Sequence, residues 1–217
     1  ELGRILLNPN PEDGLAYLIK AATQGHLDSQ KLLGLLYITG KTIPKDEIES
    51  ERWLRLAAEQ GDADAQVLLA SIYTFGWGFT VDYKEGLKWF RRAAEQEHVE
   101  AQYMLGQLLA EGKGTPKDDA SAVKWYRKAA EQGSAKAQYT LGIKYSNGEG
   151  VTENNVEAVK WYRKAAEQGE VRAQLNLGAN YYNGEAAPKD YILAYMWLNI
   201  AAAHGNETAK KYTRIVS

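Results

Sequence analysis

Apolar and polar positions follow a helical pattern in short blocks along this chain. Within a block, apolar residues recur at three and four positions, which predicts amphipathic α-helices. The clearest stretch is Ser134–Gln168, where two such blocks flank the polar, glycine-containing segment Asn147–Val151. The first block contains Ala137, Gln138, Leu141, Gly142 and Tyr145, and the second contains Val156, Val159, Trp161, Tyr162, Ala165 and Ala166. This stretch therefore predicts a helix, a loop and a second helix.

The same pattern recurs every 36 residues. Its anchors are Tyr17, Trp53, Trp89, Trp125, Trp161 and Trp197, and two alanines follow each anchor in step, as in Ala129-Ala130. Such a period is typical of a solenoid, because one helix pair cannot bury its apolar face without a neighbour. We expect each anchor tryptophan to bury on the order of 200 Å² of surface. The paired alanines would leave room for it.

Glycine recurs at two places in the repeat. Gly40, Gly76, Gly112, Gly148 and Gly184 follow the first helix, where a left-handed residue ends a helix without steric cost. Gly34, Gly106, Gly142 and Gly178 lie inside that helix, where glycine costs about 1 kcal/mol relative to alanine. The internal glycines therefore predict a close approach of a neighbouring tryptophan or tyrosine.

The repeat occupies almost the whole chain, so we predict one domain over residues 1–217. Residues 1–13 are interpreted as a partial repeat and residues 206–217 as a truncated last one. Because the chain starts at Glu1 and its last block stops before a loop, we interpret it as a fragment or processed form without its C-terminal cap.

The repeated residues resemble a known family. Trp125–Gly133, Ala137-Gln138, Leu141-Gly142, Tyr145 and Gly148–Val151 are similar to the Sel1-like repeat, a relative of the tetratricopeptide repeat. The resemblance covers residues 14–210 in six passes. It implies an all-α, right-handed α/α superhelical solenoid of about six 36-residue helix-loop-helix repeats. It also implies a bacterial protein, with a periplasmic or exported location favoured over a cytoplasmic one.

Composition narrows the classes of partner. The formal net charge is -2, so the chain lacks the positive field that drives nucleic-acid binding. The longest nearly apolar run, Leu193–Ala203, is about half the length that a membrane span needs. We therefore predict neither a nucleic-acid partner nor membrane insertion. The absence of cysteine removes disulfides and thiolate chemistry but fits a reducing or an oxidising compartment.

Candidate chemistry is sparse, and we predict no catalytic residue, cofactor or metal site. The three histidines, His26, His98 and His204, do not converge in the repeat pattern, whereas a metal needs three or four ligands at one point. The basic run Lys160, Arg163 and Lys164 recurs in earlier repeats and fits phosphate binding, but a solvated helix face explains it more simply. An enzyme is therefore the weakest functional class for this chain.

The resemblance suggests where a partner would bind. In tetratricopeptide-type stacks the helix with the Leu-Gly pair lines the concave groove, so its positions outside the repeated framework would meet a ligand. Those positions vary in residue type, as a partner-specific groove would, although drift of an unselected surface gives the same variation. The candidate residues on these helices are Tyr103, Gln107, Glu111, Tyr139, Ile143, Asn147, Tyr182 and Asn183.

The segment Phe75–Phe79 departs most from the repeat. Phe79 takes the place of Ile43 and Val151, which indicates loop core. Trp77 stands where the other repeats have a lysine or glutamate, and Phe75 also replaces polar residues or threonine. Two exposed aromatic residues would be an interaction hot spot. The alternative is that Trp77 folds back over its own repeat.

These observations favour a protein-protein interaction scaffold or adaptor that binds another protein or a peptide in its groove. The family resemblance extends this to a regulator, a host-contact factor or a toxin-immunity partner. The alternative is a receptor for a small ligand such as a cell-wall fragment, with Tyr103, Tyr139 and Tyr182 as stacking platforms. A deep aromatic pocket would favour the receptor, and a long open groove would favour the scaffold.

Overall fold

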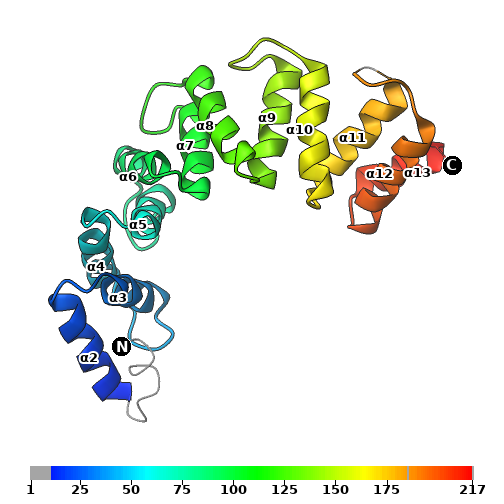
Figure 1. The fold of residues 1–217 in the computed structure, drawn as a ribbon. Coiled ribbons are helices and arrows are strands. Elements are labelled where there is room, and N and C mark those ends of the chain that lie inside the picture. Colours follow the sequence, from blue (N-terminus) through cyan, green and yellow to red (C-terminus); the bar gives the residue numbers. More distant parts are fainter. Residues whose placement is uncertain (1–10, 185, 217) are drawn as a thin grey trace. The chain divides into compact units, whose positions relative to one another are not determined.

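The structure is a computed structural model that describes residues 11–184 and 186–216, and it is all-α over those residues (Figure 1). The predicted partial repeat at 1–13 lies largely outside the described residues. The helices are α2 (Pro11–Thr23), α3 (Leu27–Thr39), α4 (Glu47–Glu59), α5 (Ala63–Phe75), α6 (Tyr83–Glu95), α7 (Val99–Glu111), α8 (Asp119–Glu131), α9 (Ala135–Asn147), α10 (Asn155–Glu167), α11 (Val171–Asn183), α12 (Tyr191–Ala203) and α13 (Glu207–Val216). The predicted helix-loop-helix repeat is confirmed.

The chain divides into two compact units. The first is formed by the residues up to Ala101 together with Lys113–Thr115, and the second by Gln102–Gly112 together with the residues from Pro116 onward. Within each unit, helices that follow one another in sequence pack together, as α3, α4, α5 and α6 do in the first and α8 to α13 in the second. The single-domain organisation stays a prediction.

The core of each unit repeats with the sequence. The leucine of each Leu-Gly position is fully buried, and so is the first alanine after each tryptophan from Ala57 onward. The six anchor residues differ in their exposed fraction. Trp53, Trp89 and Trp161 are buried, but Trp125 and Trp197 are half-buried and Tyr17 is 62% exposed. Burial therefore varies from repeat to repeat, because it depends on the neighbouring side chains of each repeat.

Glycine acts at both predicted places. Gly148 ends α9 in the left-handed conformation, with φ 69°, and its N–H donates to the carbonyl of Lys144. Gly142, inside α9, lies so close to the ring of Tyr162 that a Cβ atom would come within 2.6 Å of it. The equivalent neighbour is Tyr126 for Gly106, but leucine for Gly34 and Gly178. The predicted close approach is confirmed with a tyrosine at two of the four glycines, whereas a leucine, which was not predicted, takes that place at the other two. In all four cases the neighbour is the residue after the anchor rather than the anchor itself.

Buried glutamine side chains form hydrogen bonds that fix how the helices pair. The apolar pattern of the sequence did not predict this network. In α9, the buried Gln138 donates from Nε2 to the carbonyl of Ala130 at 3.0 Å and accepts from Nε2 of Gln168 at 2.7 Å. Gln30 and Gln66 make the same two bonds in their repeats, with distances of 2.7 to 3.0 Å. Buried amides need both partners, so these bonds specify how each helix lies on the next.

The network is incomplete at the last full repeat. Gln174 donates to the carbonyl of Ala166 at 3.1 Å, but its buried Oε1 has no hydrogen-bond partner among the described residues. The reason is in the sequence, because His204 occupies the place of Gln168. A buried acceptor without a donor costs about 1 to 3 kcal/mol.

We therefore expect His204→Gln to raise the free energy of unfolding by about 1 kcal/mol, because the new amide would donate to Gln174. Urea unfolding followed by circular dichroism measures this change. The matched control is Gln168→His, which removes the donor to Gln138 in the preceding repeat and should destabilise by a similar amount. Equal stabilities of His204→Gln and the parent chain would contradict the assignment.

Candidate functional site

The ten predicted partner-binding residues lie in both units. Phe75 and Trp77 belong to the first unit, and the other eight belong to the second, on α7, α9 and α11. Phe75, Trp77, Glu111, Asn147 and Asn183 are exposed, whereas Tyr103, Gln107, Tyr139, Ile143 and Tyr182 are half-buried. All ten therefore reach solvent at least in part, as a binding role requires.

The loop after α5 presents two aromatic rings to solvent. Phe75 is the last residue of α5 and is 52% exposed, and Trp77 is 47% exposed. Their ring centroids lie 5.9 Å apart with an interplanar angle of 27°, a stacked arrangement. Trp77 thus does fold onto its own repeat, but onto an exposed neighbour rather than into the core. Phe79, in contrast, is half-buried and lies 6.5 Å from the ring of Tyr73, in agreement with a loop-core role.

Two glycines hold this loop in place. Gly76 has φ 67° and caps α5, and a Cβ atom there would come within 2.9 Å of Cγ2 of Val81, which is 44% exposed. Gly78 has φ 84° and lies against Glu47 of α4, where a Cβ atom would come within 2.1 Å of Glu47 Cγ. The loop is therefore packed against the first turn of α4, in the preceding repeat. We call Phe75, Trp77 and Val81 the aromatic loop patch.

Tyrosine pairs form the second candidate surface. The ring of Tyr103 lies 5.8 Å from that of Tyr126, and the ring of Tyr139 lies 5.9 Å from that of Tyr162. Burial raises the pKa of Tyr126, Tyr139 and Tyr162, so these phenols stay protonated at neutral pH. The pairs have the geometry of packed aromatic contacts rather than of acid-base groups.

Arg172 covers Tyr139. Its guanidinium lies 4.6 Å from the Tyr139 ring centroid, and its Nε donates to Glu170 at 2.8 Å. The hydrogen bond to Glu170 raises the pKa of Arg172, so it stays charged. Tyr139 therefore has Tyr162 and Arg172 as ring neighbours, and it does not offer an open stacking platform. Arg172 was not among the predicted residues, although its position carries an acidic residue in the first three repeats, at Asp28, Asp64 and Glu100.

Asn147 belongs to a charged loop anchor. Its Nδ2 donates to Glu149 at 2.8 Å, and the other oxygen of Glu149 accepts from Lys144 at 2.6 Å. Lys144 is almost fully buried and also donates to Asp119 at 3.0 Å. Hydrogen bonds from Lys117 and Lys144 lower the pKa of Asp119, and those from Lys144 and Asn147 lower the pKa of Glu149. The two carboxylate partners of Lys144 raise its pKa despite its burial. The anchor fixes the direction of the loop that carries Asn147.

Tyr182 belongs to a separate aromatic cluster. Its ring lies 5.8 Å from that of Tyr191 and 6.4 Å from that of Tyr212, both edge-on. The three tyrosines proposed as stacking platforms, Tyr103, Tyr139 and Tyr182, thus each pack with a different partner. Gln107 and Ile143 lie between the tyrosine pairs and the helix ends, and Ile143 packs against the apolar core of the second unit.

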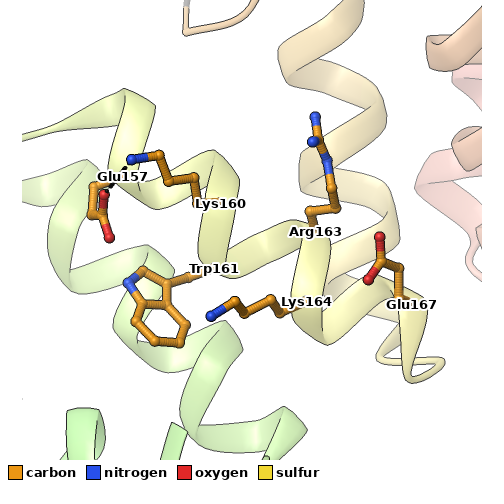
Figure 2. Close-up of a pocket in the computed structure, with 6 residues that line it drawn as sticks. All are labelled: Glu157, Lys160, Trp161, Arg163, Lys164 and Glu167. Atoms are coloured by element: carbon orange, nitrogen blue, oxygen red, sulfur yellow. Dashed lines mark hydrogen bonds and ion pairs between the residues drawn. The ribbon is translucent and has the colours of Figure 1, made fainter. Parts of the chain in front are cut away.

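A shallow pocket of about 260 Å³ lies along the outer surface of α10 (Figure 2). It is lined by Glu157, Lys160, Trp161, Arg163, Lys164 and Glu167. Figure 2 shows Lys160 directed at Glu157, at 3.0 Å, and Lys164 beside the indole of Trp161, at 4.4 Å from its centroid. The guanidinium of Arg163 donates to the hydroxyl of Tyr181.

The cations of this pocket therefore already have partners within the chain. Lys128 covers Trp125 in the same way, also at 4.4 Å, and Arg92 covers Trp89 at 4.7 Å. This favours the structural interpretation of the basic run over phosphate binding, because Lys164, Lys128 and Arg92 each lie over an anchor tryptophan. No group of three or more potential metal ligands lies together in the described part of the chain. None of its helices is both long and apolar enough to cross a bilayer.

Comparison with known proteins identifies the repeat. The model of the Sel1 repeat matches residues 1–26, 27–62, 63–98, 99–134, 135–170 and 171–206. None of the curated protein sequences matches the chain. A Sel1 repeat protein from Oxalobacter formigenes is 37% identical, with a TM-score of 0.86 over 93% of this chain and 83% of that one.

Two further solved structures are similar. A protective antigen of uropathogenic Escherichia coli strains, described as having an SLR fold, is 36% identical, with a TM-score of 0.89 over 92% of this chain. This chain spans 43% of the length of that antigen. An immunity protein from Pseudomonas aeruginosa is 23% identical, with a TM-score of 0.55 over 93% of this chain and 76% of that one, which shows a shared fold. With six matched repeats over residues 1–206, the chain belongs to the Sel1 repeat family.

Proposed function

We propose that this chain is a scaffold that binds a partner protein through the aromatic loop patch. The observation that carries the proposal is the stacked and exposed pair Phe75 and Trp77. Aromatic side chains that are already held in place lose little entropy on binding, and tryptophan is enriched among residues that dominate interface energies. Sel1 repeat scaffolds bind proteins, which agrees with this role.

The second unit carries further candidate contact residues. Tyr103 and Tyr139 are half-buried and Arg172 is exposed, and their aromatic and cationic groups suit a partner with carboxylate and apolar side chains. A regulatory, host-contact or immunity role is a finer form of the same proposal. The antigen from E. coli and the immunity protein from P. aeruginosa motivate it, but the latter shares only the fold.

Nothing in the described surface favours the alternative of a small-ligand receptor. The tyrosines proposed as platforms lie in separate clusters, and Tyr139 is covered by Arg172. The pocket on α10 is shallow, and its cations have partners within the chain. An enzymatic role also lacks support, because the family is a scaffold family and the tyrosine pKa values are raised rather than tuned toward neutrality.

The test is partner capture with the chain and its Trp77→Ala variant as baits, followed by calorimetry with each purified candidate partner. We expect Trp77→Ala to weaken binding by about 2 kcal/mol or more, which is roughly a 30-fold loss, with almost no change in melting temperature. The matched control is Val156→Ala, because Val156 is 55% exposed on α10 and lies outside the patch. Equal affinities of Trp77→Ala and the parent chain would remove the patch from the interface. A loss of stability without a loss of affinity would make Trp77 a structural residue.

A further inference from the structure

The exposed face of α12 differs from that of the other second helices of the repeats. Its six exposed residues are Tyr191, Ile192, Tyr195, Met196, Asn199 and Ala203. Ile192 is 82% exposed, and the two tyrosines and Met196 are 40% exposed or more. These residues lie at successive three- and four-residue spacings, so they form one continuous stripe along the helix. We call this stripe the α12 face.

Three of the six equivalent positions carry charge in α6, α8 and α10 alike, whereas Val156 and Val159 of α10 hold the places of Ile192 and Tyr195. Met196 replaces Lys160, Asn199 replaces Arg163, and Ala203 replaces Glu167, and α6 and α8 also have lysine, arginine and glutamate at these places. The whole of α12 contains no charged residue. At Met196, Asn199 and Ala203, the side of the helix that faces solvent has therefore lost the charge that α6, α8 and α10 carry there.

The buried side of α12 has kept the family framework. Ala194, Leu198 and Ala201 are buried like their equivalents in α10, and α12 packs on α11 and α13. Folding of the repeat thus does not require an apolar outer face. The largest exposed apolar patch of a protein is often functional, and the α12 face is therefore a candidate interaction surface.

We propose that the α12 face pairs with the α12 face of a second copy of this chain. In a two-fold symmetric contact the same residues of both copies lie against one another, so a face with net charge would repel its copy. A face with four or five charges of mostly one sign, as on α6, would repel its copy. The α12 face carries no charge and would not repel its copy. Its tyrosine, isoleucine and methionine content also matches the core of homodimer interfaces, where charge is depleted.

The area of the face indicates a weak contact. Its apolar side chains expose roughly 450 Å² per copy, so a pair would bury about 900 to 1,000 Å², which is below the range of stable specific interfaces and within that of weak, transient ones. We therefore expect a reversible dimer with a dissociation constant on the order of 10 to 100 µM. Tyr195 and Met196 lie near the middle of the helix and would meet at the two-fold axis. A membrane surface is a poorer fit, because interfacial helices carry lysine and arginine on their polar side and α12 has none.

Sedimentation velocity tests the contact over concentrations from about 1 to about 300 µM. We expect the dimer fraction to rise with concentration in the parent chain, and Ile192→Glu and Met196→Lys each to weaken dimerisation at least about tenfold. The matched control is Val156→Glu, because Val156 holds the place of Ile192 on α10 and is 55% exposed. It should dimerise like the parent chain. A chain that stays monomeric throughout, or dimers that survive both α12 substitutions, would overturn the proposal.

The absence of cysteine allows an independent test. Met196→Cys introduces a single thiol near the proposed axis, where two copies would bring the Cα atoms within the range that a disulfide needs. We expect mild oxidation to link Met196→Cys into a covalent dimer, while Lys160→Cys, at the same place on α10, stays mostly monomeric. Equal cross-linking of the two variants would show that the α12 face does not meet itself.

Discussion

Replacing Gly150 by alanine is expected to lower the free energy of unfolding by about 3 kcal/mol or more. Gly150 has φ 73°, and a Cβ atom there would lie 2.3 Å from the backbone carbonyl oxygen of Asp119. A left-handed conformation costs an alanine roughly 1 to 2 kcal/mol, and the clash adds to it because the first turn of α8 cannot give way without breaking its hydrogen bonds. With alanine at this position, the loop could no longer pack against the first turn of α8.

Gly169→Ala provides the matched control. Gly169 has φ 89°, but no atom lies within 4 Å of where its Cβ would be. The variant should therefore show only the conformational cost of about 1 kcal/mol, and the difference between the two variants measures the close approach. Urea unfolding monitored by circular dichroism gives both values. Similar losses for the two variants would mean that the loop does not pack on α8 as described.

The second large effect is expected for Trp161→Ala, which should cost about 3 to 5 kcal/mol in the free energy of unfolding. Trp161 is 5% exposed, so its removal leaves a cavity in the second unit. Trp125→Ala should cost clearly less, because Trp125 is only half-buried. Both indoles carry a lysine at 4.4 Å, from Lys164 and Lys128, so the cation-π contribution cancels in the comparison.

The Trp161→Phe variant separates the loss of apolar packing from the effect of the unpaired indole N–H. The buried Nε1 of Trp161 has no hydrogen-bond partner in the described part of the chain, so phenylalanine removes an unpaired donor while keeping most of the apolar volume. We expect its cost to be at most about half that of Trp161→Ala. Thermal and urea unfolding measure all three variants. The assignment fails if Trp125→Ala and Trp161→Ala are equally destabilising.

The candidate site was only partly predictable. Trp77 could be recognised because the same position carries charge in the other repeats, and its exposed side chain agrees with that prediction. Its stacking on Phe75 could not be recognised, since it depends on the left-handed turn at Gly76. Arg172 was missed because a variable residue on an exposed position gives no signal until its neighbour Tyr139 is placed.

The α12 face shows how both levels are needed. The loss of lysine, arginine and glutamate from α12 is visible in the sequence once the repeats are aligned. The sequence alone allows these apolar residues to be buried in an end repeat, and in that case they would have no meaning for association. The exposed fractions of Ile192 and Met196 decide the question, because burial depends on how α11 and α13 pack on the helix.

By itself, the sequence determined the all-α architecture, the 36-residue repeat, its glycine turns and its family. Each of these properties recurs in several repeats, so it can be recognised even where one repeat carries an irregular residue. Only the tertiary structure decided which anchors are buried, which leucine or tyrosine covers each internal glycine, and where Gln174 lacks a donor. These depend on contacts between residues that lie about 20 to 30 positions apart, where side-chain volume and hydrogen-bond geometry are set by the packed helices rather than by the local pattern.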